Sequence, residues 1–128
     1  MALTSDLMGL GVSAQLAAKA GHGKLQSAGA GVGTDQTAAK LITSSFVNLA
    51  PTSGQTAYIM PAKPTLAKEF LFISSAVGAD TALIFPPTGG KINNGTATTG
   101  SFSIAQNKAA VMWCYDNVNN LFAAIVLG

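Results

Sequence analysis

Five acidic side chains are the residues of this chain that could carry acid–base chemistry: Asp6, Asp35, Glu69, Asp80 and Asp116. A pair of such carboxylates could hydrolyse a glycosidic bond. Asp80 and Asp116 fall in predicted turns, however, where aspartate is a common turn former, and Glu69 begins a predicted strand as a solvated charge. We therefore predict that the protein is not an enzyme and has no catalytic residues. A small hydrolase that uses two of Asp80, Asp116 and Glu69 across an open cleft is the alternative.

The single histidine and the single cysteine are the natural candidates for metal or nucleophilic chemistry. His22 lies between two glycines, and no cysteine or second histidine is near it at metal-ligand spacing. Cys114 lies in an apolar run, which predicts a buried and unreactive thiol. The glycine-rich stretches at residues 29–33 and 89–90 do not join a strand to a helix, as a phosphate-binding loop would. We therefore expect no metal ion and no cofactor.

The composition predicts few charged contacts with any partner. Hydrophobic residues make up 48% of the 128 residues and charged residues only 9%. Globular proteins usually carry about 25% charged residues. Such a chain either hides much of its surface in an assembly or presents a neutral, hydroxyl-rich surface. All seven basic residues are scattered lysines, and without arginine or a basic cluster we expect no nucleic-acid partner.

The sequence also predicts no membrane partner. No apolar stretch reaches the ~18 residues that a membrane-spanning helix needs. The N-terminus has no basic segment, and Asp6 interrupts its first apolar residues, so we expect no signal peptide. The chain is therefore expected to be made and kept in a cytoplasm, or assembled there into something larger.

The distribution of aromatic residues divides the chain near residue 40. The first 40 residues are rich in alanine and glycine, and every Phe, Tyr and Trp lies at Phe46 or beyond. Since a core needs large side chains, we assign it to the later part. We predict an N-terminal arm and linker over residues 1–40 and a β domain over residues 41–128.

The arm carries apolar side chains at partly helical spacing, which predicts short helices before a flexible linker over residues 27–33. Such short helices are marginal alone in water, so their apolar side chains need a surface to lie on. We expect the arm to dock on a partner; a disordered terminus is the alternative. The side chains expected to make this contact are Leu3, Leu7, Met8, Leu10 and Leu16.

The later part of the chain alternates short apolar segments with turn signals, which is typical of an all-β fold. We expect a small antiparallel β-sandwich, jelly roll or barrel, with an extended, partly helical N-terminal arm. The segment at residues 69–74 is continuously apolar in its middle, as in a strand covered on both faces. Strands are predicted at residues 41–50, 55–60, 69–74, 82–85, 101–104, 109–115 and 121–127.

The block Ile84–Gly95 is the densest turn signal in the chain. A strand runs into Pro86-Pro87, and the chain then turns on Gly89-Gly90 and again on Asn94-Gly95. Trp113 lies mid-strand among apolar neighbours, which predicts a core position. Its alternative is a platform for stacking carbohydrate, and Tyr58 and Phe122 leave the same two roles open.

Residues 41–128 resemble a small β domain found in bacteriophage head decoration, cement and head-fibre proteins. The resemblance lies in the order of its parts: a strand ending in Pro61-Ala62, an apolar strand closing on Ser74-Ser75, the block Ile84–Gly95, the turn Gln106-Asn107-Lys108 and a strand containing Trp113. The opening residues 1–9 are also similar to those of such proteins. Related domains often finish with an aromatic pair, whereas this chain has Asn120-Leu121-Phe122. The resemblance implies no catalytic residues.

The resemblance implies a structural virion protein that binds the outside of an assembled capsid. The arm would clamp subunits of the major capsid protein, and the β domain would associate with copies of itself as a trimer. Such a protein would be made in the host bacterial cytoplasm and located on the capsid surface. A receptor- or carbohydrate-binding module of a phage fibre or tail is the alternative.

Overall fold

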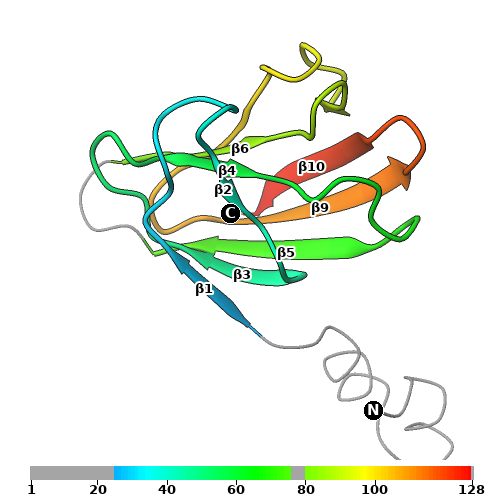
Figure 1. Cartoon of the computed structure of the whole chain (residues 1–128). Coiled ribbons are helices and arrows are strands. Elements are labelled where there is room, and N and C mark those ends of the chain that lie inside the picture. The colour runs from blue at the N-terminus through cyan, green and yellow to red at the C-terminus, as the bar shows by residue number, and fades with distance from the viewer. Residues whose placement is uncertain (1–24, 76–79, 128) are drawn as a thin grey trace, which may run out of the picture.

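The computed structural model describes residues 25–75 and 80–127, which form two β-sheets (Figure 1). The first sheet has the strand order β1 (Gln26–Gly29), β3 (Phe46–Leu49), β5 (Glu69–Ser74), β9 (Ala109–Asp116), β10 (Leu121–Leu127) and β7 (Lys91–Ile92). The second sheet has the order β2 (Lys40–Leu41), β4 (Ala57–Ile59), β6 (Ala82–Phe85) and β8 (Phe102–Ile104). The described part of the chain contains no helix, which confirms the all-β prediction.

Both sheets are mixed, so the prediction of purely antiparallel sheets was wrong. Strands β1, β3 and β5 pair in parallel, and so do β2, β4 and β6. Successive strands from β1 to β9 alternate between the two sheets, and this alternation provides the crossovers that the parallel pairs need. Parallel strands need a crossover connection, whereas a tight hairpin can join only antiparallel strands. Among the described strands, only β9 and β10 follow each other as neighbours in the same sheet.

The core lies between the two sheets, which Figure 1 shows as facing layers. Side chains alternate along a strand, so one set from each strand points between the layers. The buried cluster joins Phe70, Phe72, Met112, Cys114 and Phe122 of the first sheet to Tyr58, Ile84 and Ile104 of the second. Each fully buried large side chain contributes about 1.5–3 kcal/mol, so this cluster is the main source of stability.

Strand β1 lies where the sequence predicts the start of a flexible linker, and that part of the prediction was wrong. Ala28 is only 1% exposed. The Tyr58 hydroxyl donates a hydrogen bond of 2.6 Å to the Gly29 carbonyl oxygen, and the Lys40 ammonium donates one to the Ala28 carbonyl oxygen. The sheets therefore include residues on both sides of residue 41. The predicted contacts Leu3, Leu7, Met8, Leu10 and Leu16 and the predicted arm helices lie outside the described residues.

The remaining strand predictions agree well with the structure, except that one predicted strand is two strands. The segments predicted at residues 69–74, 82–85 and 121–127 are β5, β6 and β10. The segment predicted at residues 41–50 is divided between β2 and β3, which lie in different sheets. The chain crosses between the layers there, and Ser45 is buried at the crossing.

The second turn of the block Ile84–Gly95 is centred one residue earlier than predicted. The Gly95 amide donates to the Ile92 carbonyl oxygen at 3.0 Å, so Asn93 and Asn94 are the central residues of the turn. Their φ angles are 51° and 60°. A turn with two central residues of positive φ favours asparagine and glycine, because asparagine tolerates the left-handed region better than most residues. Two consecutive asparagines therefore meet this requirement.

Ser74→Ala is expected to stabilise the protein by about 1 kcal/mol, because it removes a buried hydroxyl that has no partner. Ser74 Oγ is the one buried side-chain polar atom in the described residues that lacks a hydrogen bond. Ser75→Ala is the matched control, since Ser75 Oγ donates a 2.7 Å hydrogen bond to Asn48 Oδ1 and its loss should be destabilising. Urea unfolding of both variants gives the sign of the change in the free energy of unfolding. A destabilised Ser74→Ala variant contradicts the prediction.

Candidate interaction surface

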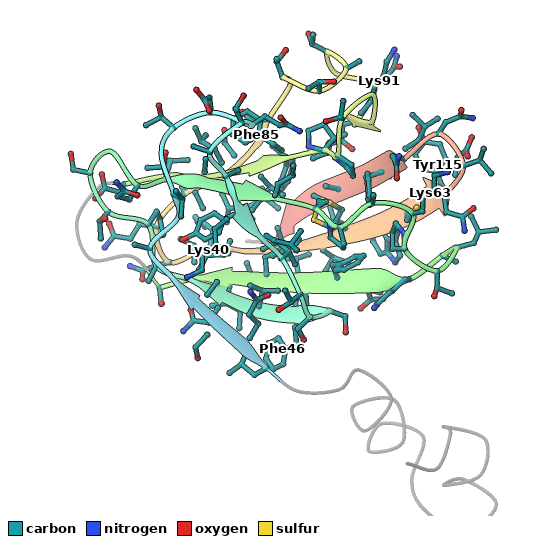
Figure 2. The ribbon with its side chains drawn as sticks, in the orientation of Figure 1. Lys40, Phe46, Lys63, Phe85, Lys91 and Tyr115 are labelled. Atoms are coloured by element: carbon teal, nitrogen blue, oxygen red, sulfur yellow. The ribbon has the colours of Figure 1, made fainter. Side chains whose placement is uncertain are left out.

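On the side of the six-stranded sheet that faces away from the core, neighbouring positions of β3, β5, β9 and β10 carry apolar side chains, bordered by Asn48 and Glu69. We call this apolar area the outer face. Along β3, β5, β9 and the first part of β10 its members alternate with buried residues, so their side chains point to the opposite side of the sheet; at the end of β10, Ile125 to Leu127 are all exposed. Figure 2 shows Phe46 on the side of β3 away from the second sheet. The outer face consists of Phe46, Leu71, Ile73, Ala109, Val111, Trp113, Ala123, Ile125 and Leu127.

The strand register places these side chains in rows across the sheet. Phe46 pairs with Leu71, Leu71 with Val111, and Val111 with Ile125. In the rows on either side, Ile73 pairs with Ala109 and Ala109 with Leu127, and Trp113 pairs with Ala123. Directly paired residues have Cβ atoms about 4.5–5.5 Å apart, so the outer face is one continuous apolar area.

Several residues of the outer face are strongly exposed in the single chain. Ile125 is 52% exposed, Leu127 42% and Ile73 39%. The sequence of β5 predicts a strand covered on both faces, but only the side that carries Phe70, Phe72 and Ser74 is buried. Leu71 is partly exposed and Ile73 exposed on the opposite side. A strand suited to burial on both sides therefore has one side accessible.

The extent of the outer face is that of a functional patch. Four strands at a spacing of about 4.8 Å and seven residues at about 3.3 Å each span roughly 19 by 23 Å. The resulting ~400 Å² lies within the range of the largest apolar patch on ordinary monomers, which is often functional. Glu69, which pairs with Trp113 across β5 and β9, is the one acidic or basic residue at the outward positions of β3, β5, β9 and β10 between Phe46 and Leu127.

One of the carboxylates considered for catalysis, Asp116, makes the hydrogen bonds of a turn. Asp116 accepts hydrogen bonds from the amides of Val118 and Asn119, at 3.0 Å each, and from Asn119 Nδ2 at 2.9 Å. These hydrogen bonds hold the pKa of Asp116 below its ordinary value, and the bond from the Asn119 side chain has the largest effect. Asp116 thus orders the β9–β10 turn. Among residues 25–75 and 80–127, no three His, Cys, Asp or Glu side chains are grouped to hold a metal ion.

The three aromatic residues considered for carbohydrate stacking are divided between the core and the outer face. Tyr58 and Phe122 are fully buried, and burial raises the pKa of Tyr58 to about 12. Trp113 is partly exposed on the outer face, so its predicted core position was wrong. Its neighbours Met112 and Cys114 take the core positions instead. A continuous apolar run predicts a strand, but it does not reveal which of its sides points inward.

The predicted burial of Cys114 is confirmed. Its side chain is fully buried and forms no disulfide, and burial raises the pKa of the thiol. A thiol with a raised pKa has little of the reactive thiolate form at neutral pH. Cys114 therefore belongs to the core packing rather than to a reactive site.

The fold and the outer face define a class: a small protein of two mixed β-sheets with an accessible apolar sheet face. Comparison with family models, with curated proteins and with solved structures gives no match. In the described residues, no helix is long and apolar enough to cross a membrane.

Proposed function

We propose that this protein is a structural component of the bacteriophage virion, which binds the outer surface of the capsid and stabilises or decorates it. The N-terminal arm clamps neighbouring subunits of the major capsid protein. The β domain associates with copies of itself as a trimer. The protein is made in the host bacterial cytoplasm, acts on the capsid surface, and uses neither a nucleic acid nor a membrane nor a cofactor as a partner.

The outer face is the observation that carries this proposal. A continuous apolar area of this size is within the range of the largest patch on a monomer, and such a patch is often an interaction site. An uncharged, apolar sheet face and a chain with only 9% charged residues both suit a protein that is buried in an assembly. The resemblance of residues 41–128 to phage decoration proteins supplies the kind of assembly, a capsid.

We further propose that the two sheets form a β-sandwich rather than a barrel or a jelly roll. Each sheet has two edge strands among the described residues: β1 and β7 in the first sheet, and β2 and β8 in the second. A closed barrel has no such edges, and a jelly roll is built from antiparallel strands, whereas both sheets here contain parallel pairs. Buried side chains from both sheets meet in one cluster, as the inner faces of a sandwich do.

The arm has enough apolar side chains to attach the protein to a capsid. Burial of four or five of its aliphatic side chains contributes on the order of 6–12 kcal/mol before ordering costs are subtracted. A trimer carries three such arms. Once one arm is bound, the others bind at high effective concentration, so affinity increases without new types of contact.

The second candidate function is a receptor- or carbohydrate-binding module of a phage fibre or tail. The outward position of Trp113 favours it, because an accessible tryptophan can stack on a sugar ring. The burial of Tyr58 and Phe122 weighs against it, since a platform of three aromatic side chains is not assembled.

Deletion of residues 2–24 is expected to weaken binding to preformed capsids by on the order of 100-fold, the equivalent of about 2.7 kcal/mol. Capsid occupancy is measured by sedimentation of particles over a range of protein concentrations. Leu7→Ser combined with Leu10→Ser should reproduce most of the loss. Lys19→Ser combined with Lys24→Ser is the matched control and should bind normally. Undiminished occupancy of the deletion variant rules out docking by the arm, and absence of the full chain from mature particles rules out the virion function itself.

A further inference from the structure

We propose that Asn94 is a self-modification site, at which the side-chain amide is converted to a carboxylate through a cyclic imide formed with the backbone of Gly95. Asn94 is the one asparagine of this chain that is followed by glycine. The reaction needs only this chain and water, so it takes place whether or not the protein binds a capsid. The turn that holds Asn94 and Gly95 controls how often the reaction begins.

The reaction is an intramolecular attack on a side-chain carbonyl group. The Gly95 amide nitrogen loses its proton to a base in solution and attacks Cγ of Asn94. The new bond between this nitrogen and Cγ closes the imide, while the bond from Cγ to Nδ2 breaks and Nδ2 takes up a proton from water and leaves as ammonia. Water then adds to either carbonyl carbon of the imide, which gives aspartate or isoaspartate. Glycine favours the attack, because it has no side chain beside the nitrogen and permits a wide range of backbone conformations.

The side chain that is attacked is accessible in the folded protein. Asn94 and Gly95 are both exposed. Within residues 25–75 and 80–127, no hydrogen bond engages the Asn94 side chain. The side chain of Asn93, by contrast, is held by two hydrogen bonds to the main chain of Ala124. Rotation about its side-chain bonds can therefore bring Cγ of Asn94 to the Gly95 nitrogen, whereas Asn93 is fixed.

The attacking nitrogen is restrained by the turn. The Gly95 amide donates a 3.0 Å hydrogen bond to the Ile92 carbonyl oxygen, and Asn94 has the left-handed φ of 60°. An amide in such a hydrogen bond loses its proton only when the bond opens, as in hydrogen exchange. The folded chain therefore reacts from an open form of the turn, and the fraction of molecules in this form sets the rate.

Opening of the turn does not require global unfolding. The hydrogen bond between Gly95 and Ile92 closes the turn, and the two hydrogen bonds between Asn93 and Ala124 tie it to β10. Hydrogen bonds at the surface open locally, at a lower free energy than that of global unfolding. The Asn93 side chain thus protects its neighbour, because the loss of its two hydrogen bonds frees the turn.

The product should weaken the turn in which it forms. In isoaspartate the main chain runs through Cγ, which lengthens the path between Asn93 and Gly95. The Gly95 amide then no longer meets the Ile92 carbonyl oxygen at the distance and angle of a hydrogen bond. The contacts of Asn93 with Ala124 depend on the same turn, so the modified chain should expose the Ala124 amide.

The test is incubation of the full, folded chain at neutral and at mildly alkaline pH, followed by mass mapping of tryptic peptides against an unincubated sample. Cleavage after Lys91 and Lys108 yields residues 92–108, which contain Asn94 and, as an internal control, Asn107, which is followed by lysine. Asn94 should gain the mass of a deamidation, faster at the higher pH, while Asn107 stays unchanged. Asn94→Gln is the matched control and should not react, because glutamine would have to close a larger ring.

Two comparisons test the control by the turn. The chain unfolded in urea should modify Asn94 at least about 10-fold faster than the folded chain. Folded Asn93→Ala should modify Asn94 at least about fivefold faster than the original chain, beyond the loss of global stability measured by hydrogen exchange of β5 amides. Near-ultraviolet circular dichroism confirms that this variant is folded.

Four results would overturn the inference. An Asn94 that stays intact in the folded chain but reacts in urea shows that the turn prevents the reaction. Equal rates in the folded and unfolded chains show that the turn does not control it, and equal rates in the original chain and Asn93→Ala show that Asn93 does not protect it. Modification of Asn107 as fast as that of Asn94 removes the special role of Gly95. Because the assay contains no capsids, these results leave the proposed function untouched, and failure of capsid binding leaves the modification standing.

Discussion

Gly90→Ala is expected to destabilise the protein by about 3 kcal/mol, because the new methyl group has no space. A Cβ atom on Gly90 would lie 2.5 Å from the Asn120 carbonyl oxygen and 2.8 Å from the Asn120 Cβ atom. Asn120 is held in place from two sides, so it cannot move away cheaply. Its carbonyl oxygen accepts a hydrogen bond from the Lys91 amide at 3.1 Å, and its Oδ1 accepts one from the Lys63 amide at 2.7 Å.

Gly89→Ala is the control that separates the two reasons why a position requires glycine, a positive φ angle and the lack of space for a Cβ atom. Gly89 has a φ of +82° and nothing within 4 Å of its added Cβ atom, so alanine there is strained but meets no neighbour. That conformational strain costs about 1–2 kcal/mol. Urea unfolding of the two variants, at unchanged slope, gives both values. Equal losses would show that the close approach of Gly90 to Asn120 does not matter.

The contact between Gly90 and Asn120 matters for the outer face because it lies where the block Ile84–Gly95 meets the last strand. Lys91 and Ile92 of β7 pair in parallel with Leu121 and Phe122 of β10. The same strand β10 carries Ile125 and Leu127 of the outer face farther along. The turn-rich block therefore positions a strand of the outer face.

Short apolar runs between turn signals identified most strands but not their pairing. Residues 69–74 and 82–85 are apolar runs bounded by turns, and this local signal predicts β5 and β6. Pairing depends on which sheet each strand joins, and the alternation of successive strands between two sheets has no local signal in the sequence. The antiparallel prediction therefore failed, although the strands themselves were right.

Strand β1 shows a second limit of local reasoning. Ser27, Ala28 and Gly29 are small residues without periodicity, and a flexible linker is the ordinary interpretation of such a stretch. Their strand is imposed by distant partners, since Tyr58 and Lys40 bind the carbonyl oxygens of Gly29 and Ala28. Such contacts become visible only in the folded chain.

The outer face was partly visible in the sequence. The apolar middle of residues 69–74 predicts a strand covered on both sides. In the structure, one of these sides belongs to the outer face. Trp113 was misplaced because every residue from Ala109 to Tyr115 is apolar or aromatic, which removes the alternation that distinguishes the inner side from the outer. In the structure, Trp113 pairs with Glu69 and Ala123, and these pairings place Trp113 on the outer side of the sheet.

Asn93→Ala is expected to destabilise the protein by about 3 kcal/mol. The Asn93 side chain donates a 2.9 Å hydrogen bond from Nδ2 to the Ala124 carbonyl oxygen and accepts one of 2.8 Å at Oδ1 from the Ala124 amide. The amide group thus acts as a strand partner for β10 beyond the two residues that pair with β7. Two hydrogen bonds contribute about 1–3 kcal/mol, and alanine at a φ of 51° adds about 1 kcal/mol.

Asn94→Ala is the matched control, because Asn94 is exposed and has a similar φ of 60°. It should cost only the conformational part, about 1 kcal/mol. The difference between the two variants in urea unfolding then measures the two hydrogen bonds. Losses that do not differ would show that the Asn93 amide adds nothing.

The Asn93→Ala variant should also loosen the end of β10 that carries Ile125 and Leu127. Without its partner, the Ala124 amide opens to solvent, so its hydrogen exchange should become at least about 10-fold faster than the loss of global stability accounts for, whereas amides in β5 should become faster only by that loss. An edge that opens in this way presents the outer face less often in its ordered form. Exchange of the Ala124 amide should change in Asn94→Ala only by the loss of global stability, although neither residue belongs to the outer face. An Ala124 exchange that follows global stability alone in Asn93→Ala would show that the Asn93 amide does not hold the end of β10.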